Sequence, residues 1–248
     1  MKNIFKVFII SLLSIPSFAQ VMSGQIVFER KMDWVKKMNK AKYLTQEEKD
    51  REEQTWKNDE VYVFKLLLTF TPNQTFYTHE SQTHTSTDGT YNWRADDYYI
   101  TRDFEQNTLF EYKEMLIKNY IVKDTLQAPK WKILNEIKEV AGYVCMKAST
   151  FDAAKDQEVV AWFTTDIPVS GGPEEYYGLP GMILELNIDN EAVLVTATSV
   201  VLNKDQKLPE LPKKMKGKTI NLKTQTELIT KYRKEQEALH RFPWGIRY

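Results

Sequence analysis

Cysteine is almost absent from the sequence, since Cys145 is the only one among 248 residues. One cysteine cannot close an internal disulfide, so the packed core has to hold the fold without a covalent cross-link. No histidine or cluster of basic residues lies near Cys145 in the sequence. We therefore interpret its thiol as a buried structural group rather than a nucleophile.

An excess of charge of either sign is also missing. Lys and Arg together number 34, and Asp and Glu together number 34. A protein that binds nucleic acid normally carries a basic excess, so this balance argues against a nucleic-acid partner.

Histidine is scarce, with three in the chain, and His79 and His84 are five positions apart. This spacing fits no zinc signature, and a metal site needs at least one further ligand. Motifs for catalysis are missing too. Ser170-Gly171-Gly172 is no Gly-x-Ser-x-Gly elbow, and no Gly-Lys-Ser/Thr follows to make a phosphate-binding loop. We predict no catalytic residue, no cofactor and no metal.

No apolar run is long enough to cross a membrane, since a spanning helix needs roughly 20 apolar residues. Residues 1–19 instead show the features of a secretory signal peptide. Lys2 and Lys6 precede an apolar core over residues 7–15, and a small-x-small cleavage site follows at residues 17–19. We predict cleavage after Ala19 and export to the periplasm, to the outer membrane or out of the cell.

What the sequence does have is a dense group of Gly and Pro in residues 167–186, with four of the nine glycines and three of the nine prolines. Glycine permits positive φ and proline fixes φ, so such a segment is an ordered loop with one path. Pro180-Gly181 has the signature of a type II turn, which needs a positive φ at Gly181. The nearly continuous apolar run in residues 182–186 predicts a strand that is buried on both faces.

This loop is also where we predict a binding surface. Aromatic side chains beside a Gly/Pro loop often form a binding face, although core packing is an alternative for the tyrosines and the favoured one for Trp162. The carboxylates of Glu174, Glu175 and Glu185 could do acid/base chemistry, but hydrogen bonds to loop amides explain them more simply. We expect the glycines to be structural and any function of the loop to lie at its rim, at Glu175 and Tyr176. The candidate site residues are Asp166, Glu175, Tyr176, Tyr177, Gly178, Leu179, Pro180, Gly181, Met182 and Ile183.

Residues 177–185, Tyr-Gly-Leu-Pro-Gly-Met-Ile-Leu-Glu, resemble the signature of the GLPGLI family, exported proteins of Bacteroidota named for that hexapeptide. Met182 stands where the signature has leucine. Residues 161–169 and 137–148 are similar to two other blocks that recur in the family. The resemblance covers most of the predicted mature chain and is specific over residues 131–186. The family has no established activity, so the resemblance implies export and architecture but no mechanism.

The rest of the chain alternates short strand patterns with turn signals. At least eight stretches rich in β-branched and aromatic residues recur at roughly ten-residue spacing, which is typical of an antiparallel meander. Residues 31–59 differ, because apolar residues at helical spacing among Lys, Glu and Gln predict a helical excursion, with a capping box at Thr45 and Glu48. Residues 224–239 predict a C-terminal helix. Its apolar side contains Leu228, Ile229, Tyr232 and Leu239.

The predicted fold is therefore mainly β, a β-rich α+β protein. It consists of a large curved antiparallel sheet or an open barrel, with a helical excursion after the first strand and a C-terminal helix. We divide the chain into a signal peptide (1–19), an antiparallel β domain (20–208) with the helical insertion (31–59), and a final segment (209–248). That segment is a basic linker and the C-terminal helix, which packs on or beside the sheet.

Two functions fit these expectations. The first is an exported, non-catalytic binding or accessory protein of the cell envelope, working with an outer-membrane transporter. The second is a periplasmic carrier that holds a lipid-like or peptide ligand in an apolar cavity of the curved sheet. A hydrolase that uses carboxylates near the Gly/Pro loop is a distant third. The partner that these hypotheses imply is an envelope protein or an apolar ligand.

Overall fold

A computed structural model describes residues 22–56, 62–85 and 92–248. The predicted signal peptide, residues 1–19, lies outside the described residues. None of the helices in these ranges has the length and apolar character needed to span a bilayer. In chain order the elements are β1 (Gly24–Met32), α1 (Trp34–Asn39), α2 (Gln46–Trp56), β2 (Tyr62–Phe70), β3 (Gln74–His79), β4 (Thr83–Thr85), β5 (Asn92–Arg94), β6 (Tyr99–Asp103), β7 (Thr108–Met115), β8 (Lys118–Thr125), β9 (Lys132–Val140), β10 (Tyr143–Asp152), β11 (Gln157–Thr164), β12 (Met182–Ile188), β13 (Val193–Leu202), β14 (Lys218–Ile220) and α3 (Leu222–Ala238).

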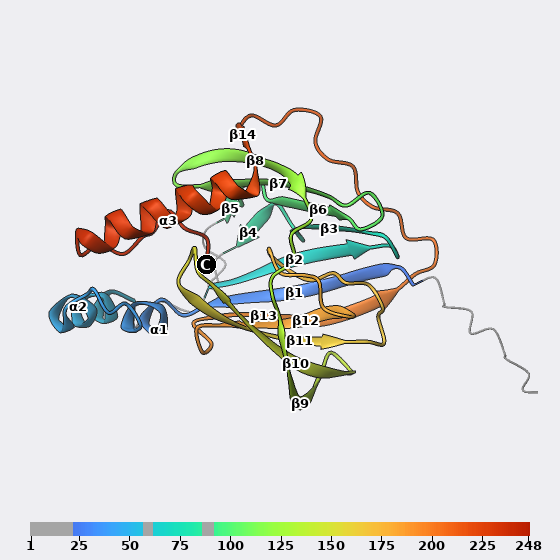
Figure 1. Ribbon diagram of the computed structural model, residues 1–248, viewed down its shortest axis with the longest axis horizontal. Helices are drawn as coiled ribbons and strands as arrows, with labels where there is room; N and C mark the ends of the chain where they lie inside the picture. The colour runs from blue at the N-terminus through green and yellow to red at the C-terminus, as the bar shows by residue number, and fades with distance from the viewer. Residues whose placement is uncertain (1–21, 57–61, 86–91) are drawn as a thin grey trace, which may run out of the picture.

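Twelve strands form one twisted, curved sheet in the order β14-β8-β7-β6-β3-β2-β1-β13-β12-β11-β10-β9 (Figure 1). Neighbouring strands are antiparallel except β14, which runs parallel to β8. The sheet is open, with β14 and β9 at its edges. The helices α1 and α2 lie between β1 and β2 in the chain, and α3 lies against β8. The structure thus confirms the predicted mainly β fold with a helical excursion and a C-terminal helix.

Alternation along the strands determines which side chains enter the core. In β1, Ile26, Phe28 and Met32 are buried, whereas Val27, Glu29 and Lys31 are more exposed. Phe28 pairs with the buried Leu66 of β2. Because successive side chains of a strand point to opposite faces, these residues share one face, here called the inner face. Arg30 occupies the same inward series and is also buried.

Local signals begin both helices of the excursion. Asp33 caps α1, because its side chain accepts a hydrogen bond from the Lys36 amide at 2.9 Å. Before α2, the Thr45 amide donates to the Glu48 carboxylate at 2.7 Å, and the Glu48 amide donates to the Thr45 hydroxyl at 3.3 Å. These two reciprocal bonds are the predicted capping box.

The Gly/Pro loop, defined here as residues 165–181, connects β11 to β12, and its turn differs from the predicted type II turn. That turn would direct the Met182 amide to the Leu179 carbonyl. Instead the Gly181 amide donates to the Leu179 carbonyl at 2.8 Å, a three-residue γ-turn around Pro180. The Met182 amide donates to a carbonyl at the start of the loop. The positive φ that the sequence requires of Gly181 is confirmed, at 150°.

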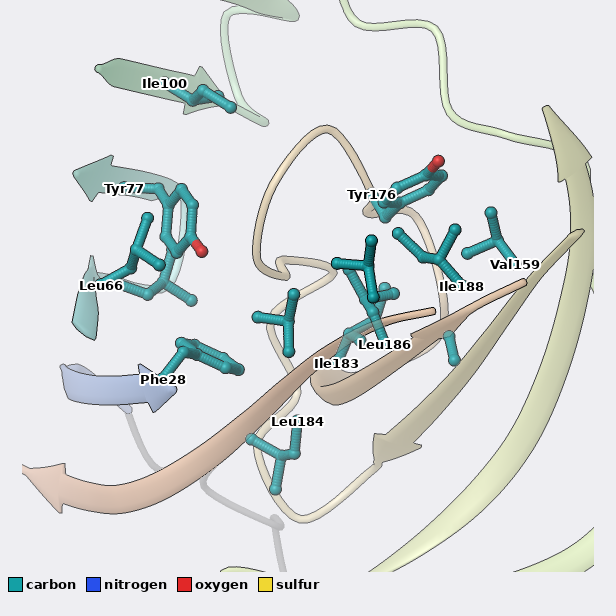
Figure 2. Close-up of a cluster of buried hydrophobic side chains, with 14 of the residues drawn as sticks. Phe28, Leu66, Tyr77, Ile100, Val159, Tyr176, Ile183, Leu184, Leu186 and Ile188 are labelled. Atoms are coloured by element: carbon teal, nitrogen blue, oxygen red, sulfur yellow. The ribbon is translucent and has the colours of Figure 1, made fainter. Parts of the chain in front are cut away.

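The strand β12 is buried on both faces, as its apolar run predicts. The loop lies against it, because the Ile183 amide donates to the Gly171 carbonyl at 3.0 Å and a Cβ added at Gly172 would lie 2.9 Å from Cβ of Ile183. Figure 2 shows Ile183, Leu184 and Leu186 of β12 in one buried cluster with Tyr176 of the loop. The loop therefore occupies the place that a covering helix has in other sheets.

The segment between β13 and α3 is more than the predicted linker. Its apolar side chains pack on the outer face of the sheet, and the chain then adds β14 beside β8. This outer cluster contains Phe76, Tyr99, Tyr112, Leu208, Leu211 and Met215. The predicted apolar side of α3 is correct at Ile229, which is buried. It is wrong at Leu239, which is 59% exposed because it is the C-cap that follows the last helical turn.

Gly181 fixes the path of the chain into β12. A Cβ at this position would lie 2.0 Å from the Thr164 carbonyl oxygen, and φ is 150°. We expect Gly181→Ala to lower the free energy of unfolding by at least about 3 kcal/mol, because backbone strain and the clash add. Urea unfolding followed by circular dichroism measures this change.

Gly142→Ala is the matched control. Gly142 also has a positive φ of 82°, but no atom lies within 4 Å of the added Cβ. Only the conformational strain remains there, which is about 1 kcal/mol. Equal losses of stability in the two variants would show that the contact with Thr164 contributes nothing.

Candidate functional site

The Gly/Pro loop carries two consecutive carboxylates, Glu174 and Glu175, into the interior. The backbone at Glu174 has a φ of 52°, which is uncommon for a residue with a Cβ. A residue in that conformation persists only where its surroundings hold it. The surroundings here are two separate groups of cations from distant parts of the chain.

Two arginines and two tyrosines bind the carboxylate of Glu174. Arg247 donates to it twice, from Nε at 3.0 Å and from Nη2 at 2.9 Å, and Nε of Arg30 lies 3.4 Å away. The hydroxyls of Tyr98 and Tyr77 donate at 2.8 and 3.3 Å. Burial alone raises the pKa of Glu174, but the guanidinium groups outweigh this effect and lower the pKa to about 2.

Lysines bind the carboxylate of Glu175. Lys155 donates at 2.7 Å, Lys113 forms a second ion pair, and the Gln225 side-chain amide donates from α3 at 3.4 Å. Lys113 is in turn 2.7 Å from the carboxylate of Glu111. Burial alone raises the pKa of Glu175, but Lys113 and then Lys155 outweigh it and bring the pKa well below its usual range. Glu175 is therefore ionised at neutral pH.

Arg102 of β6 holds the loop backbone. Its guanidinium donates to the carbonyl of Gly172 at 3.0 Å and to the carbonyl of Glu174. It also lies 4.7 Å from the centre of the Tyr177 ring. The indole of Trp131 donates to the Tyr177 carbonyl at 2.8 Å. These bonds satisfy carbonyl groups that would otherwise be buried without donors.

The predicted rim of the loop is largely buried, which agrees with the core-packing alternative for its tyrosines. Tyr176 and Tyr177 are 4% and 5% exposed, and only a fifth of the Glu175 side chain is exposed. The Tyr176 hydroxyl lies 3.0 Å from the Gln157 amide and 3.4 Å from Asp152. Tyr176 also belongs to the buried core cluster that includes Ile229 of α3, so its ring contributes to the packing of the interior.

The remaining candidate residues are divided between surface and core. Asp166, Gly178 and Pro180 are exposed. The other five are buried: Tyr177, Leu179, Gly181, Met182 and Ile183. The structure thus does not bring Asp166 to the ion-pair groups inside the loop, and a binding role for these residues stays a prediction.

The carboxylates near the loop do not form a catalytic pair. Glu174 and Glu175 lie in different cation groups, and Glu185 forms an ion pair with Lys138. The expected hydrogen bonds from loop amides are replaced by bonds from side-chain cations. A general acid needs a pKa near the working pH, and both loop carboxylates have a lowered pKa. This geometry weighs against acid/base catalysis.

Sequence reasoning missed the cations that hold the loop. Arg30, Arg102 and Lys113 lie on β1, β6 and β7 at buried positions, and Arg247 lies in the tail after α3. A signal was present in β1 and β6, because Arg30 and Arg102 stand in the apolar phase of an alternating pattern. A charge in that phase marks a buried ionic partner.

Two cavities border these residues. The loop pocket, of about 350 Å³, lies between the Gly/Pro loop, the start of α3 and the turn between β10 and β11. The tail pocket, of about 510 Å³, lies beside the tail that follows α3. The polar and aromatic lining of the loop pocket includes Glu111, Phe151, Asp152, Lys155, Glu175, Tyr176, Tyr177 and Gln225. The tail pocket is lined by Arg30, Trp34, Phe64, Tyr98, Trp244 and Arg247, among others.

Cys145 is fully buried, as predicted, and burial raises the pKa of its thiol to about 11. A thiol with that pKa is a poor nucleophile at neutral pH. In the part of the chain that the structure describes, no group of His, Cys, Asp and Glu side chains could hold a metal ion.

Comparison with known proteins adds little beyond the fold. A family model described as a protein of unknown function (Porph_ging) matches residues 150–185, from the end of β10 into β12. No protein of curated function matches the sequence. Two crystal structures of PNGF-II, in different space groups, are similar over 84% of this chain, with 16% identity and a TM-score of 0.50. The chain spans only 33% and 32% of those proteins, and the likeness concerns the fold alone.

Because of Glu174, the free energy of unfolding should depend on pH under acidic conditions. A carboxyl whose pKa is lowered by folding stabilises the fold fully above its ordinary value of 4.5 and loses that contribution as pH falls toward about 2. The contribution is on the order of 3 kcal/mol. We expect the free energy of unfolding, measured in urea, to fall across this pH window.

Glu174→Gln should lose stability at neutral pH, by about 3 to 5 kcal/mol, because Arg30 and Arg247 stay buried without their counter-ion. Its acid transition should also be shallower than that of the wild type. Glu136→Gln is the control, since Glu136 forms an ion pair with Lys147 on the surface. That change should cost less than about 1 kcal/mol. An acid transition of wild-type steepness in Glu174→Gln would contradict the assignment.

Proposed function

We propose that the protein is an exported, non-catalytic binding protein of the cell envelope and that its ligand enters the loop pocket. The observation that carries the proposal is the position of Glu175, Tyr176 and Tyr177. These consecutive residues of the candidate stretch, although largely buried, line the loop pocket. Export is supported by the signal-peptide features of residues 1–19 and by the resemblance to an exported family.

The size and walls of the loop pocket suit a small ligand. Its volume of about 350 Å³ is at the lower end of the range for ligand sites. Apolar side chains, including Leu109, Leu222 and Ile229, line it together with the charged groups. The ion pairs of Glu175 fix its wall before any ligand arrives, and a preformed wall reduces the entropy lost on binding.

Binding fits the pocket better than catalysis does. Among the described residues that line it, none is a Ser, Cys or His. Lys155 and Glu175 neutralise each other at 2.7 Å, so neither is free to act as a base.

In the carrier hypothesis, the ligand would bind at a different place in this fold. The inner face, which would enclose an apolar ligand, is filled by the Gly/Pro loop. The tail pocket is the alternative, because Trp34, Phe64 and Trp244 line it and its volume is about 510 Å³. A lipid that co-purifies with the protein and occupies the tail pocket would support the carrier.

Native mass spectrometry of the protein isolated from the periplasm of its native cells tests the proposal. We expect a bound molecule on the wild type that is absent from Thr226→Trp, because Thr226 is exposed on α3 and lines the loop pocket. Glu227→Trp is the matched control, since Glu227 is the next residue, is exposed and is not part of the lining. A ligand retained by Thr226→Trp, or no ligand on any form, would contradict the proposal.

Export has its own test. Expressed in a Gram-negative host, the chain should lose residues 1–19 and begin at Gln20. Mass analysis of the N-terminal peptide from periplasmic material measures this directly. Periplasmic protein that retains Lys2 would show that the segment is not a cleaved signal peptide.

A further inference from the structure

We infer that the loop pocket takes a positively charged group rich in N–H donors on a narrow stem, the guanidinium or ammonium of a basic side chain. This inference rests on the proposed function, because it names the ligand class of the same pocket. Three independent features of the pocket wall support it: an acceptor without a donor, a carboxylate without a cation, and exposed aromatic surface at the mouth.

Gln225 supplies the unpartnered acceptor. It is 6% exposed and lines the pocket, and its Nε2 donates to Glu175 at 3.4 Å. Its Oε1 has no hydrogen-bond partner among the described residues. Reversing the amide would place two acceptor oxygens against each other, so the contact with Glu175 fixes its orientation. A buried acceptor without a donor costs free energy, and a ligand N–H recovers that free energy.

Asp152 supplies the unpaired charge. Its Oδ1 accepts the backbone amides of Ala154 and Lys155, at 3.0 and 3.2 Å. Among the described residues, its Oδ2 accepts a hydrogen bond from the Tyr176 hydroxyl alone, at 3.4 Å. No ion pair involves Asp152 in the described part of the chain, in contrast to Glu111 and Glu175 in the same wall. The carboxylate therefore has capacity for a cationic donor.

The charge balance of the wall points the same way. Glu111, Asp152 and Glu175 line the pocket with a single cation, Lys155. Lys113 reaches Glu111 and Glu175 from within the sheet, so Lys113 and Lys155 together neutralise these two carboxylates. Beyond the wall, Arg102 and Asp124 lie near Tyr177 with opposite charges, so together they leave this balance unchanged. The wall keeps one negative charge in excess, which attracts a cation and repels an anion.

Aromatic side chains complete the match. Tyr176 and Tyr177 form part of the wall, and Phe151 is 57% exposed where the pocket meets solvent. Cations, and guanidinium groups above all, bind favourably over aromatic faces. A neutral hydroxylated ligand would leave Asp152 without a counter-ion, and an anionic ligand would face it directly.

Titration of ¹⁵N-labelled protein with four probes tests the inference. Acetyl-Gly-Arg-Gly-amide presents a guanidinium group on a peptide, and agmatine presents one on a small free amine. The same peptide with Gln or Glu in place of Arg is the neutral or the acidic comparison. We expect saturable shifts of the Gln225 side-chain amide and an affinity for the basic peptide at least about tenfold above the Gln and Glu peptides. Agmatine binding tighter than the basic peptide would identify free amines, rather than protein segments, as the source of the group.

Asp152→Asn should lose this preference, because it removes the charge and keeps an oxygen for the two backbone amides. Asp156→Asn is the matched control, since Asp156 lies in the same turn and does not line the loop pocket. It should bind as the wild type does. The wild-type titration alone decides the inference if the Asp152 variant does not fold.

The outcomes separate the two proposals. Equal or tighter binding of the Gln or Glu peptide overturns the ligand class and leaves the loop pocket as a ligand site. Failure of every probe, with a native ligand still lost from Thr226→Trp, also overturns only the class. Failure of every probe and no native ligand in the pocket overturns both.

Discussion

The carboxylate of Glu174 is the interaction on which the arrangement of the interior depends. It joins the Gly/Pro loop to β1 through Arg30, to β3 through Tyr77, and to the tail after α3 through Arg247. A buried carboxylate costs several kcal/mol in lost hydration, and only a full set of charged and hydroxyl donors offsets that cost. The loop can therefore fold into the sheet only when strands and tail, from the two ends of the chain, are in place around it.

Buried cations also hold the tail that follows α3. The guanidinium of Arg30 also donates to the Tyr248 carbonyl at 2.5 Å, and Lys37 of α1 lies 3.9 Å from the centre of the Tyr248 ring. Lys37 itself forms a buried ion pair with Asp189, in the turn after β12. Charged side chains thus connect the helical excursion, the tail and the turn that follows the loop's own strand. Polar contacts of this kind need defined geometry, which favours one arrangement of the interior over others that apolar packing alone would permit.

The fold could be predicted from the sequence because its signals are local. Alternation in the strands, the capping box at Thr45 and the Gly/Pro density before Met182 each act within a few residues. The candidate site could be predicted only in its location on the loop. Its environment depends on Arg30, Arg102 and Arg247, which lie up to about two hundred residues apart in the chain. They meet only through the order of the strands and the path of the tail after α3. Burial of Tyr176 follows from that tertiary arrangement, and no periodicity reports it.

Glu174 and Glu175 are adjacent in the loop but make different contacts, and the peptide bond between them couples their positions. Glu174 anchors the loop to arginines, while Glu175 forms the wall of the loop pocket with Lys155 and Gln225. Because a trans peptide fixes the spacing of the two residues, the Glu174 contacts set the position of that wall. The ion pairs that stabilise the fold thereby also preorganise the pocket, so that its ordering is complete before a ligand binds. This explains why a segment so rich in buried charge carries the surface that we propose for binding.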